Sequence, residues 1–566
     1  MKLAGARILL ECLKMEGVDT VFGYPGGTVI NIFDELYSFK EITNILPRHE
    51  QAAVHAADGY ARATGKVGVA IATSGPGATN TVTGIATAYM DSIPLVVITG
   101  QVPTPLIGND AFQEVDIIGI TRPCTKHNFL VKNVKDLALI MKKAFYIART
   151  GRPGPVLVDL PKDVQIAAAE FKYPDSIELR AYKPTIEGHP RQIEKAASLL
   201  LSSKKPVIYA GGGVVLANAA EELSHLATTL LAPVTTTLMG LGSFPEDSHL
   251  SLGMLGMHGT YYANMAVTEC DLLLAVGARF DDRVTGKISE FAPHAKIIHI
   301  DVDPTSIKKN VRVDLPIVGD VKDVLARMVV VIEGDSSVLD LHKEAVKPWL
   351  DQIDGWKSSR PMLYSQEEAV IKPQYVIQKL REICDQDAII ATDVGQHQMW
   401  TAQFFKFTRP RTLLTSGGLG TMGFGLPAAM GAQVAFPQRQ VIAICGDGGF
   451  QMNLQEMATL VQNRLPVKIC IMNNNYLGMV RQWQELFFEK RYSHTVLDLP
   501  IDFVMLAKAF GATGFLATKQ EEVEDTIRNA FNTPGPVIME FRIAREEKVL
   551  PMVPAGASLN QMVLAS

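Results

Sequence analysis

The sequence has few cysteines, no strong excess of charge of either sign and no long apolar run. Its 566 residues include 6 cysteines, and 54 Lys and Arg stand against 59 Asp and Glu, which gives a net charge of −5. That balance offers no electrostatic reason for a nucleic acid or an anionic membrane to bind. No apolar run reaches the length that spans a bilayer. We therefore expect neither a nucleic-acid-binding nor a membrane protein.

The cysteines are scattered, form no CxxC pair and lie in part within apolar runs. Such a distribution favours buried thiols in a reducing compartment over disulfides or a zinc site. The apolar N-terminal segment is not typical of a signal peptide, because Glu11 and Lys14 interrupt it, its spacing is helical and no small-residue cleavage site follows. We expect a cytoplasmic protein.

Apolar, β-rich runs alternate with helical segments along the whole chain, as is typical of parallel α/β sheets. The length favours three domains. We expect doubly wound parallel-sheet domains at 1–165, 190–335 and 373–545, irregular linkers at 163–189 and 333–372, and a tail at 546–566. The expected strands include 44–47, 67–74, 95–100 and 156–160 in the first domain, 206–211, 272–277 and 297–302 in the second, and 388–393, 441–447, 467–474 and 537–541 in the third.

Residues 68–80 and 441–453 resemble each other faintly, because each has an apolar run, a glycine-rich turn and a helix start. This repeat is compatible with two related domains on either side of a third. A strand followed by a glycine turn is common in α/β folds, so the repeat alone is weak evidence.

The most specific motif is GDGGF at 446–450, followed by NNN at 473–475. Asp447 and Asn474 each follow a predicted strand, so in a parallel sheet both would face the crevice at the strand ends. Carboxylate and amide oxygens suit Mg²⁺ or Ca²⁺. Gly446, Gly448 and Gly449 would let the backbone approach a diphosphate at a helix N-terminus. Alternatively, both turns only cap helices.

These motifs resemble those of the thiamine diphosphate (ThDP) enzymes. GYPGG at 23–27, RHE at 48–50 and SGPGATN at 74–80 have the order and spacing of that family's pyrimidine-binding domain. The resemblance implies that Asp447 and Asn474 bind Mg²⁺ by their side chains and Tyr476 by its carbonyl. It also implies that Glu50 hydrogen-bonds the pyrimidine N1′ and activates the cofactor, as a charge-assisted hydrogen bond can do in a dry site. Otherwise Glu50 is a carboxylate at a helix N-terminus.

The same resemblance implies further ThDP contacts. Met422 would support the bent cofactor from below, although most Met residues are core residues. Gly395, Gln396 and His397 match the segment that contacts the diphosphate, and His397 has the alternative of a surface position near a helix start. The remaining matching positions are Gly420, Gly478 and Met479.

Within that family, the chain resembles the biosynthetic acetohydroxyacid synthases over nearly its whole length. The segments 107–128, 148–164, 255–259, 277–286 and 473–488 carry this resemblance. It implies that pyruvate loses carbon dioxide on ThDP and is joined to a second pyruvate, giving 2-acetolactate, or to 2-ketobutyrate, giving 2-aceto-2-hydroxybutyrate. These products begin valine, leucine and isoleucine biosynthesis. The alternatives are a ThDP and FAD pyruvate oxidase, a catabolic acetolactate synthase and a non-catalytic ThDP-binding protein.

The central domain carries YAGGG at 209–213, which alone is weak evidence for a dinucleotide loop. The resemblance implies FAD with no redox role. Arg279 and Arg283 have the alternative of ion pairs with Asp281 or Asp282. The positions implied to bind FAD are Arg152, Gly211, Gly212, Gly213, His258, Arg279, Arg283, Asp301 and Asp320.

The resemblance places Gly27 and Gln113 at the reacting centre and Phe112 and Lys162 in the substrate channel. Gly27 has the alternative of a turn glycine with positive φ, and Lys162 that of a solvated lysine. Met479, Val480 and Trp483 lie on one predicted helix, where core packing is the simpler interpretation. The resemblance implies instead a second-substrate pocket, in which Trp483 favours 2-ketobutyrate over pyruvate.

The resemblance also implies an assembly. In the family the cofactor lies between two subunits, so a homodimer is the smallest active unit and a homotetramer is compatible with it. A small regulatory subunit is a usual partner of such enzymes.

Overall fold

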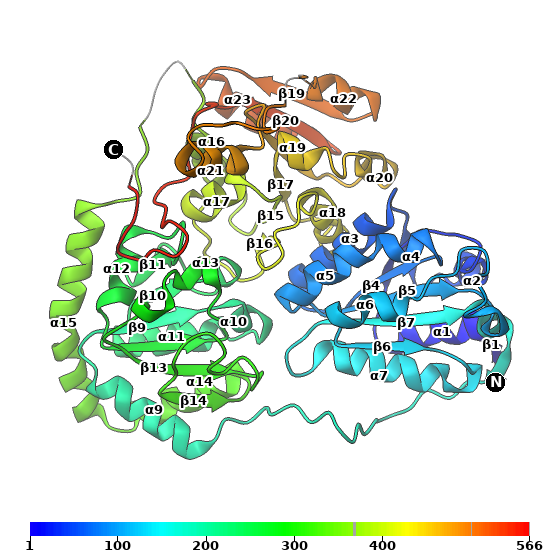
Figure 1. Cartoon of the computed structure of the whole chain (residues 1–566), viewed down its shortest axis with the longest axis horizontal. Coiled ribbons are helices and arrows are strands. Elements are labelled where there is room, and N and C mark those ends of the chain that lie inside the picture. Colours follow the sequence, from blue (N-terminus) through cyan, green and yellow to red (C-terminus); the bar gives the residue numbers. More distant parts are fainter. Residues whose placement is uncertain (366–369, 498, 500, 565–566) are drawn as a thin grey trace. The chain divides into compact units, whose positions relative to one another are not determined.

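The computed structural model describes residues 1–365, 370–497, 499 and 501–564, which form three α/β domains, each with a six-stranded parallel sheet. The chain packs into two compact units. The first comprises Met1–Lys183, Asp385–His397 and Leu414–Arg542, and the second comprises Pro184–Cys384, Gln398–Leu413 and Ile543–Ser566. The first and third sheets belong to the first unit. Helices cover both faces of the sheets (Figure 1), so the expected doubly wound fold class is confirmed.

The first sheet carries the N-terminal domain, and its helices follow the strands as the periodicity predicts. Its strand order is β3 (Thr43–Ile45), β2 (Thr20–Gly23), β4 (Gly68–Ala72), β5 (Leu95–Gln101), β7 (Pro155–Pro161) and β6 (His127–Leu130). Its helices are α1 (Gly5–Met15), α2 (Ile30–Ser38), α3 (Glu50–Thr64), α4 (Pro76–Asn80), α5 (Val82–Asp91), α6 (Ile117–Thr121), α7 (Leu137–Arg149) and α8 (Lys162–Ile166).

The second sheet has the strand order of dinucleotide-binding domains, 3-2-1-4-5-6 when counted along the domain. The strands, in that spatial order, are β11 (Ser251–Met254), β10 (Val234–Thr236), β9 (Pro206–Ala210), β12 (Leu272–Val276), β13 (Lys296–Asp301) and β14 (Leu315–Val318). The helices are α9 (Pro190–Ser202), α10 (Gly212–Leu216), α11 (Ala220–Leu230), α12 (Tyr261–Glu269), α13 (Asp282–Thr285), α14 (Val321–Glu333) and α15 (Ser336–Ser359).

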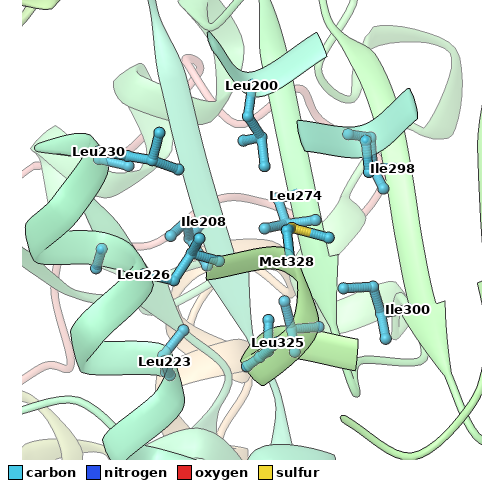
Figure 2. Close-up of a cluster of buried hydrophobic side chains, with 14 of the residues drawn as sticks. Leu200, Ile208, Leu223, Leu226, Leu230, Leu274, Ile298, Ile300, Leu325 and Met328 are labelled. Atoms are coloured by element: carbon cyan, nitrogen blue, oxygen red, sulfur yellow. The ribbon is translucent and has the colours of Figure 1, made fainter. Parts of the chain in front are cut away.

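An apolar core lies between this second sheet and its helices. Figure 2 shows Leu223, Leu226 and Leu230 of α11 facing Ile208 of β9 and Leu274 of β12, and all of them are fully buried. Burial of a side chain of this size stabilises the fold by about 1.5–3 kcal/mol relative to exposure. The core therefore gives the strand ends of this domain a rigid base.

The third sheet repeats the topology of the first. Counted along each domain, both sheets have the order 2-1-3-4-6-5, which explains the faint internal repeat in the sequence. The strands are β16 (Leu413–Leu414), β15 (Ile389–Thr392), β17 (Val441–Gly446), β18 (Lys468–Asn473), β20 (Val537–Arg542) and β19 (Thr513–Ala517). The helices in this part of the chain are α16 (Pro373–Ile383), α17 (Gln396–Phe404), α18 (Gly425–Ala435), α19 (Asp447–Phe450), α20 (Glu456–Gln462), α21 (Gly478–Phe487), α22 (Phe503–Ala509) and α23 (Glu522–Asn532).

Helices α3 and α18 join the N-terminal and C-terminal domains within the first unit. Each carries the pattern Ala-x-x-Gly, and the glycine of each faces the alanine of the other. A Cβ atom on Gly59 would overlap the backbone of Ala428, and one on Gly431 would overlap the backbone of Ala56. Glycine is therefore required at both positions by the close approach of the two helices.

Two expectations about linkers were wrong in part. Most of 333–372 is the helix α15, whose Leu339, Val346 and Trp349 are buried in the cores of the second unit. The start of 163–189 contains α8 and the strand β8 (Ala168–Glu170), which pairs antiparallel with β1 (Lys2–Ala4). The sequence of α15 has no strand pattern, because its apolar positions recur at helical spacing.

The other sequence expectations about class also have structural outcomes. All six cysteines are free thiols, and five of them are buried. In the ranges that the structure describes, no helix is both long and apolar enough to cross a bilayer. Single turns of 3-10 helix lie at Thr104–Leu106, Arg122–Cys124, Val134–Asp136, Leu238–Gly240 and Ile288–Glu290.

Candidate active site

Asp447 and Asn474 lie side by side at the carboxyl edge of the third sheet. β17 ends at Gly446 and β18 at Asn473, and the two strands are hydrogen-bonded neighbours with Gly446 opposite Met472. The prediction that both residues follow neighbouring strand ends is therefore confirmed, and their role as metal ligands stays a prediction. Burial raises the pKa of the Asp447 carboxyl to about 7, although backbone N–H groups, including that of Asn474, lower it. A buried carboxylate of this kind gains from a cation at its free edge.

The Asn474 side chain is oriented from two sides. Its Oδ1 accepts a hydrogen bond from the backbone N–H of Tyr476 at 3.0 Å, and its Nδ2 donates to Gln396 Oε1 at 3.4 Å. Gln396 Nε2 in turn donates to Gln482 Oε1 at 2.9 Å. A Cβ atom on Gly478 would overlap Gln396 Oε1, so glycine is needed there for this chain of amides to form.

The segment 395–397 lies against the GDG turn. Gly395 has a φ of +152°, and a Cβ atom at that residue would lie 3.0 Å from the His397 ring. A Cβ atom on Gly446 would lie equally close to His397 Nδ1. Burial lowers the pKa of His397 to about 4, so its ring is neutral at pH 7. His397 is buried, which contradicts its reading as a surface residue.

Met422 also belongs to this group. Its Cε lies 3.9 Å from the point that a Cβ atom of Gly448 would occupy. The turn before it contains Gly420, which has a φ of +70°. Met422 is only partly buried, unlike an ordinary core methionine. The third domain thus brings Gly395, Gln396, His397, Met422 and the residues of the two motifs together.

Asp393, which the sequence reasoning did not single out, holds the Met422 turn. Its carboxylate accepts hydrogen bonds from the N–H groups of Gly423, at 3.0 Å, and Gly425, at 3.1 Å. Burial raises the pKa of this carboxyl, and these backbone hydrogen bonds lower it. Its position directly after the strand 389–392 was the signal that could have revealed it, as for Asp447.

The segment that leads into this turn is held from the N-terminal domain. Asp91 accepts hydrogen bonds from the N–H groups of Gly417, at 3.1 Å, and Gly418, at 2.7 Å. The buried Arg62 donates to Asp91 at 2.9 Å and to the carbonyl of Thr415 at 2.8 Å. The contacts of Asp91 with Gly417 and Gly418 and of Arg62 with Thr415 join residues more than 300 positions apart, and no local sequence pattern reveals them.

Glu50 is the first residue of α3, at the carboxyl edge of the first sheet. Its Oε2 accepts a hydrogen bond from Asn80 Nδ2 at 3.0 Å, and its Oε1 lies 3.2 Å from the point that a Cβ atom of Gly77 would occupy. A helix N-terminus favours the ionised carboxylate. Both interpretations of Glu50 predict this position, and the Glu50 side chain is partly buried beside the glycine-rich 75–77 turn.

Gln113 and Gly27 lie on loops that approach the same glycine-rich turn. Gln113 has a φ of +59°, and a Cβ atom on Gly75 would lie 2.9 Å from its carbonyl. The Oγ1 atoms of Thr28 and Thr73 are 2.9 Å apart, which brings the loop of Gly27 to the turn. Gly27 does not have a positive φ, and a Cβ atom there would meet open space. The reading of Gly27 as a positive-φ turn glycine is therefore wrong.

Phe112 and Lys162 lie on the same edge of the domain. Phe112 is 89% exposed, which is unusual for an aromatic side chain and leaves it available to a ligand or a second chain. Lys162 begins α8 directly after β7 and is half-buried. In this helix Gln165 Nε2 donates to the carbonyl of Thr28 at 2.7 Å, which links α8 to the Gly27 loop.

Met479, Val480 and Trp483 lie in the first turns of α21, directly after the Asn474 turn. Val480 is 53% exposed, and Met479 and Trp483 are partly buried. The Trp483 ring packs edge-on against Phe487, with centroids 5.4 Å apart. These side chains are not core residues, so the core-packing reading does not account for them.

Arg481 of the same helix lies between two aromatic rings, 4.4 Å from the Tyr476 centroid and 4.3 Å from that of Tyr492. This arrangement fixes the residue whose carbonyl is the third expected metal ligand. Sequence reasoning missed Arg481, because the ring of Tyr492 is contributed by a later loop.

The glycine-rich turn of the central domain has a packing explanation. Cβ atoms on Gly211 and Gly213 would overlap or crowd the backbone of Gly277. At Gly212 the nearest atom would be Met239 Cβ at 3.1 Å. The turn lies at the end of β9, beside the end of β12, which is the switch point where such sheets bind ligands.

The other predicted flavin residues already have partners within the chain. Arg279 pairs with Asp281 at 2.5 Å and Arg283 with Asp282 at 3.7 Å, as the alternative reading expected. Asp320 caps α14, and Asp301 accepts a hydrogen bond from the N–H of Asp303 at 2.8 Å. The remaining two are His258, buried beside the carbonyl of Pro551, and Arg152, which donates to Ser92 in the first unit.

Among the residues that the structure places, no cluster of three or more His, Cys, Asp or Glu side chains could hold a metal ion. The ligand set expected from the sequence is of another kind, namely one carboxylate, one amide and one carbonyl, completed by phosphate and water oxygens.

Three family models match the chain. Residues 3–120 match the model described as "Thiamine pyrophosphate enzyme, N-terminal TPP binding domain", residues 193–328 the central domain of these enzymes, and residues 393–541 their C-terminal TPP binding domain. Thiamine pyrophosphate is another name for ThDP. Each match falls on a different one of the three sheets.

Curated relatives are similar over essentially the whole chain. The acetolactate synthase large subunit of Buchnera aphidicola is 49% identical over 99% of this chain and 98% of its own. The acetolactate synthase isozyme 3 large subunit of Escherichia coli is 47% identical over 100% of this chain and 99% of its own. A probable acetolactate synthase large subunit of Methanocaldococcus jannaschii is 50% identical over 99% and 95%.

Proposed function

Because the chain belongs to the acetolactate synthase large subunits of the thiamine pyrophosphate enzymes, we propose that it decarboxylates pyruvate and joins the remaining two-carbon unit to a second 2-ketoacid. Pyruvate as acceptor gives 2-acetolactate, and 2-ketobutyrate gives 2-aceto-2-hydroxybutyrate. These are the first common reactions of valine, leucine and isoleucine biosynthesis. The observation that carries this proposal is the near-complete coverage of relatives that are about half identical.

When bound, ThDP supplies the nucleophilic carbon and the electron sink for both steps. We assign its diphosphate to the third domain, beside Gly395, Gln396, His397 and Gly446. Asp447, Asn474 and the carbonyl of Tyr476 would hold Mg²⁺. The residues fit, because the donors are hard oxygens at one strand edge and glycines leave the backbone open to phosphate oxygens. The remaining proposed contacts are Gly420, Met422, Gly448, Gly449, Gly478 and Met479.

Glu50 is the proposed activating group. Its carboxylate would accept a hydrogen bond from the pyrimidine ring of bound ThDP and so promote the activation of the cofactor. Asn80 holds one carboxylate oxygen, and Gly77 leaves room beside the other. A positioned group of this kind contributes typically ~10²–10⁴-fold to the rate.

The substrate side is assigned to exposed residues on the two strand edges. Gly27 and Gln113 would approach the reacting carbon, and Phe112 and Lys162 would form the channel. Val480 and Trp483 would form the pocket for the second 2-ketoacid. Such a pocket discriminates one methylene by only ~1–3 kcal/mol, so a moderate preference for 2-ketobutyrate is expected.

FAD is the proposed third cofactor, without a redox role. The central sheet has the strand order of dinucleotide-binding domains, and Gly211–Gly213, Arg279 and Asp301 follow β9, β12 and β13 at the edge where ligands bind. Carboligation transfers no electrons to a flavin. The test is replacement of FAD by a redox-inert analogue, which should leave acetolactate formation intact and would stop a pyruvate oxidase.

The proposed assembly is a homodimer or homotetramer in the cytoplasm, in which one subunit supplies Glu50 and another Asp447 to each cofactor. The six free cysteines support a reducing compartment. The relatives' designation as large subunits supports a small regulatory subunit as partner.

The deciding experiment is a product assay with pyruvate, ThDP, Mg²⁺ and FAD. Acetolactate is the expected product. Acetate with reduced flavin would identify a pyruvate oxidase, acetaldehyde alone a simple decarboxylase, and no turnover a non-catalytic ThDP-binding protein. Added 2-ketobutyrate should shift the product to 2-aceto-2-hydroxybutyrate, which separates the biosynthetic enzyme from a catabolic one.

A further inference from the structure

Helix α20 of the third domain holds the loop that leads into α3. The backbone N–H of Arg48 donates to both carboxylate oxygens of Glu456, at 2.9 Å to Oε1 and 3.1 Å to Oε2. One turn later, Thr459 Oγ1 contacts the carbonyl of Leu46 at 3.2 Å. The Arg48 guanidinium also donates to Gln462. Three successive positions on one face of α20 thus hold two residues of the 46–48 loop.

Glu456 is fully buried, and its hydrogen bonds go to this loop and its own helix. Besides the Arg48 N–H, its Oε2 accepts the Thr459 hydroxyl at 2.8 Å. Burial raises the pKa of the Glu456 carboxyl to about 7, although these hydrogen bonds lower it. A buried carboxylate costs stability unless its oxygens are hydrogen-bonded. These hydrogen bonds offset the cost of burial, and two of them tie Glu456 to the loop before Glu50.

We propose that Glu456 is a positioning residue for Glu50: by holding the backbone of Arg48 from the opposite domain, it fixes the direction in which α3 begins. His49 is the N-cap of α3, with its Nδ1 accepting the N–H of Gln51 at 3.2 Å, and Glu50 is the first helical residue. The backbone at Arg48 thus sets the place of the Glu50 Cα. Asn80 fixes only the far end of the side chain, at one oxygen.

This inference rests on the proposed function, in which Glu50 must meet one ring nitrogen of ThDP. Misplacement of a reacting group by about 1 Å can cost on the order of 10²-fold in rate. The expected consequence of losing the Glu456 contact is therefore a lower rate of C2 proton loss, with little change in the diphosphate and Mg²⁺ contacts of the third domain.

The test uses the full-length protein in four forms: wild type, Glu456→Gln, Glu50→Gln and the double variant. The amide that replaces the Glu456 carboxylate would keep one accepting oxygen but would set an NH₂ group against the Arg48 N–H. The readouts are hydrogen–deuterium exchange of the C2 proton of bound ThDP, kcat and KM for pyruvate, and ThDP affinity. Amide hydrogen exchange of residues 46–52 is measured in the protein without cofactor.

Glu456→Gln should slow C2 exchange and lower kcat by roughly 10-fold to 10²-fold while KM and ThDP affinity stay near wild type. It should also speed amide exchange at 46–52. In the Glu50→Gln background the second substitution should add nothing, because residues that act as a unit are not additive. The matched control is Gln462→Ala, which removes the side-chain contact to Arg48 but not the backbone contact, and should keep the wild-type C2 exchange.

Wild-type C2 exchange in Glu456→Gln would overturn the inference, and so would an equal loss in the wild-type and Glu50→Gln backgrounds. Wild-type exchange in Glu50→Gln itself would instead refute the proposed role of Glu50. If Glu456→Gln does not fold, Thr459→Val takes its place. That variant removes only the hydroxyl shared by Glu456 and Leu46, and it should give a smaller change in the same direction; no change would overturn the inference.

Discussion

The N-terminal and C-terminal domains have the same strand order but carry different chemistry at the same edge. In the first, a carboxylate begins the helix that follows the second strand of the sheet along the chain, and a glycine-rich turn lies beside it. In the third, the oxygen donors follow the third and fourth strands, and burial raises the pKa of the carboxyl. Both parallel sheets thus place functional candidates at the same edge, and the loop sequences decide whether these are the carboxylate proposed for proton transfer or the oxygen donors proposed for a metal.

Each of these two domains also holds a segment of the other by hydrogen bonds. Asp91 of the first domain holds Gly417 and Gly418 in the segment before Met422, and Glu456 of the third holds Arg48 in the loop before Glu50. The α3–α18 contact joins the same two domains, with the same pair of small residues on each helix. Each half of the proposed cofactor site therefore depends on a domain that does not contain it.

The largest effect is expected from Glu50→Gln, which tests the chemical half of the comparison. The amide cannot take the charge-assisted hydrogen bond, so kcat should fall by about 10²–10⁴-fold, while the fold and flavin binding stay intact. Steady-state acetolactate formation and flavin absorbance measure the two effects. Glu41→Gln, at an exposed carboxylate of the same domain, should keep full activity; near-normal turnover in Glu50→Gln would remove Glu50 from the role.

Asp447→Asn tests the proposed metal site of the third domain, and its effect should differ in kind from that of Glu50→Gln. Loss of the charge should weaken Mg²⁺ and ThDP binding by on the order of 10²-fold, as removal of a metal-site partner does. Excess Mg²⁺ and ThDP should restore part of the activity, which they should not do for Glu50→Gln. Titration of activity with Mg²⁺ measures this. Identical Mg²⁺ dependence in the variant and the wild type would contradict the assignment of Asp447.

Gly59→Ala and Gly431→Ala test whether the two domains contribute equally at their contact. Each added methyl group would overlap backbone atoms of the facing helix, so each should destabilise the contact by about 1–3 kcal/mol. Amide hydrogen exchange in α3 and α18 reports the change. The control is Gly355→Ala in α15, where a Cβ atom meets open space and helix propensity predicts a gain of about 0.5–1 kcal/mol. A large effect of one substitution alone would show that the contact is not reciprocal.

The smallest effect is expected from Trp483→Leu, since the pocket discriminates only one methylene. With mixed 2-ketoacids, the ratio of 2-aceto-2-hydroxybutyrate to 2-acetolactate should fall, and acetolactate should still form. The fall should correspond to a loss of no more than ~1–3 kcal/mol in the preference for 2-ketobutyrate. Phe488→Leu, at a 52% exposed side chain beyond the helix, serves as control and should leave the ratio unchanged. A constant ratio in Trp483→Leu would move the pocket elsewhere.

The fold class and the strand-end positions of Asp447 and Asn474 could be predicted because they depend on local signals. Buried strands such as β4, β5 and β17 are continuous apolar runs, and Asp447 and Asn474 follow such runs directly. Short strands such as β10 and β16 were not singled out, because two or three residues carry no periodicity. The segment that forms α15 has no strand character, and this lack alone predicted a linker there.

The supporting contacts could not be predicted from one sequence. Glu456 and Arg48 are separated by 408 positions, and Asp91 and Gly418 by 327. Their partners are brought together only when α3 meets α18. For Gly27, in contrast, the structure rules out one of the two interpretations from the sequence. Its φ is not positive, so the backbone does not require glycine, and a Cβ atom there would meet open space.

The contact between α3 and α18 has a consequence for the synthesis of the protein. Helix α18 begins roughly 360 positions after α3 ends, which corresponds to roughly 20–70 s of translation at ~5–20 residues/s. During that interval the small-residue face of α3 and the buried Arg62 have no partner from the third domain. Until α18 has been synthesised, the N-terminal domain therefore exposes the face of α3 that α18 later covers. This is the stage at which chaperones would act on it.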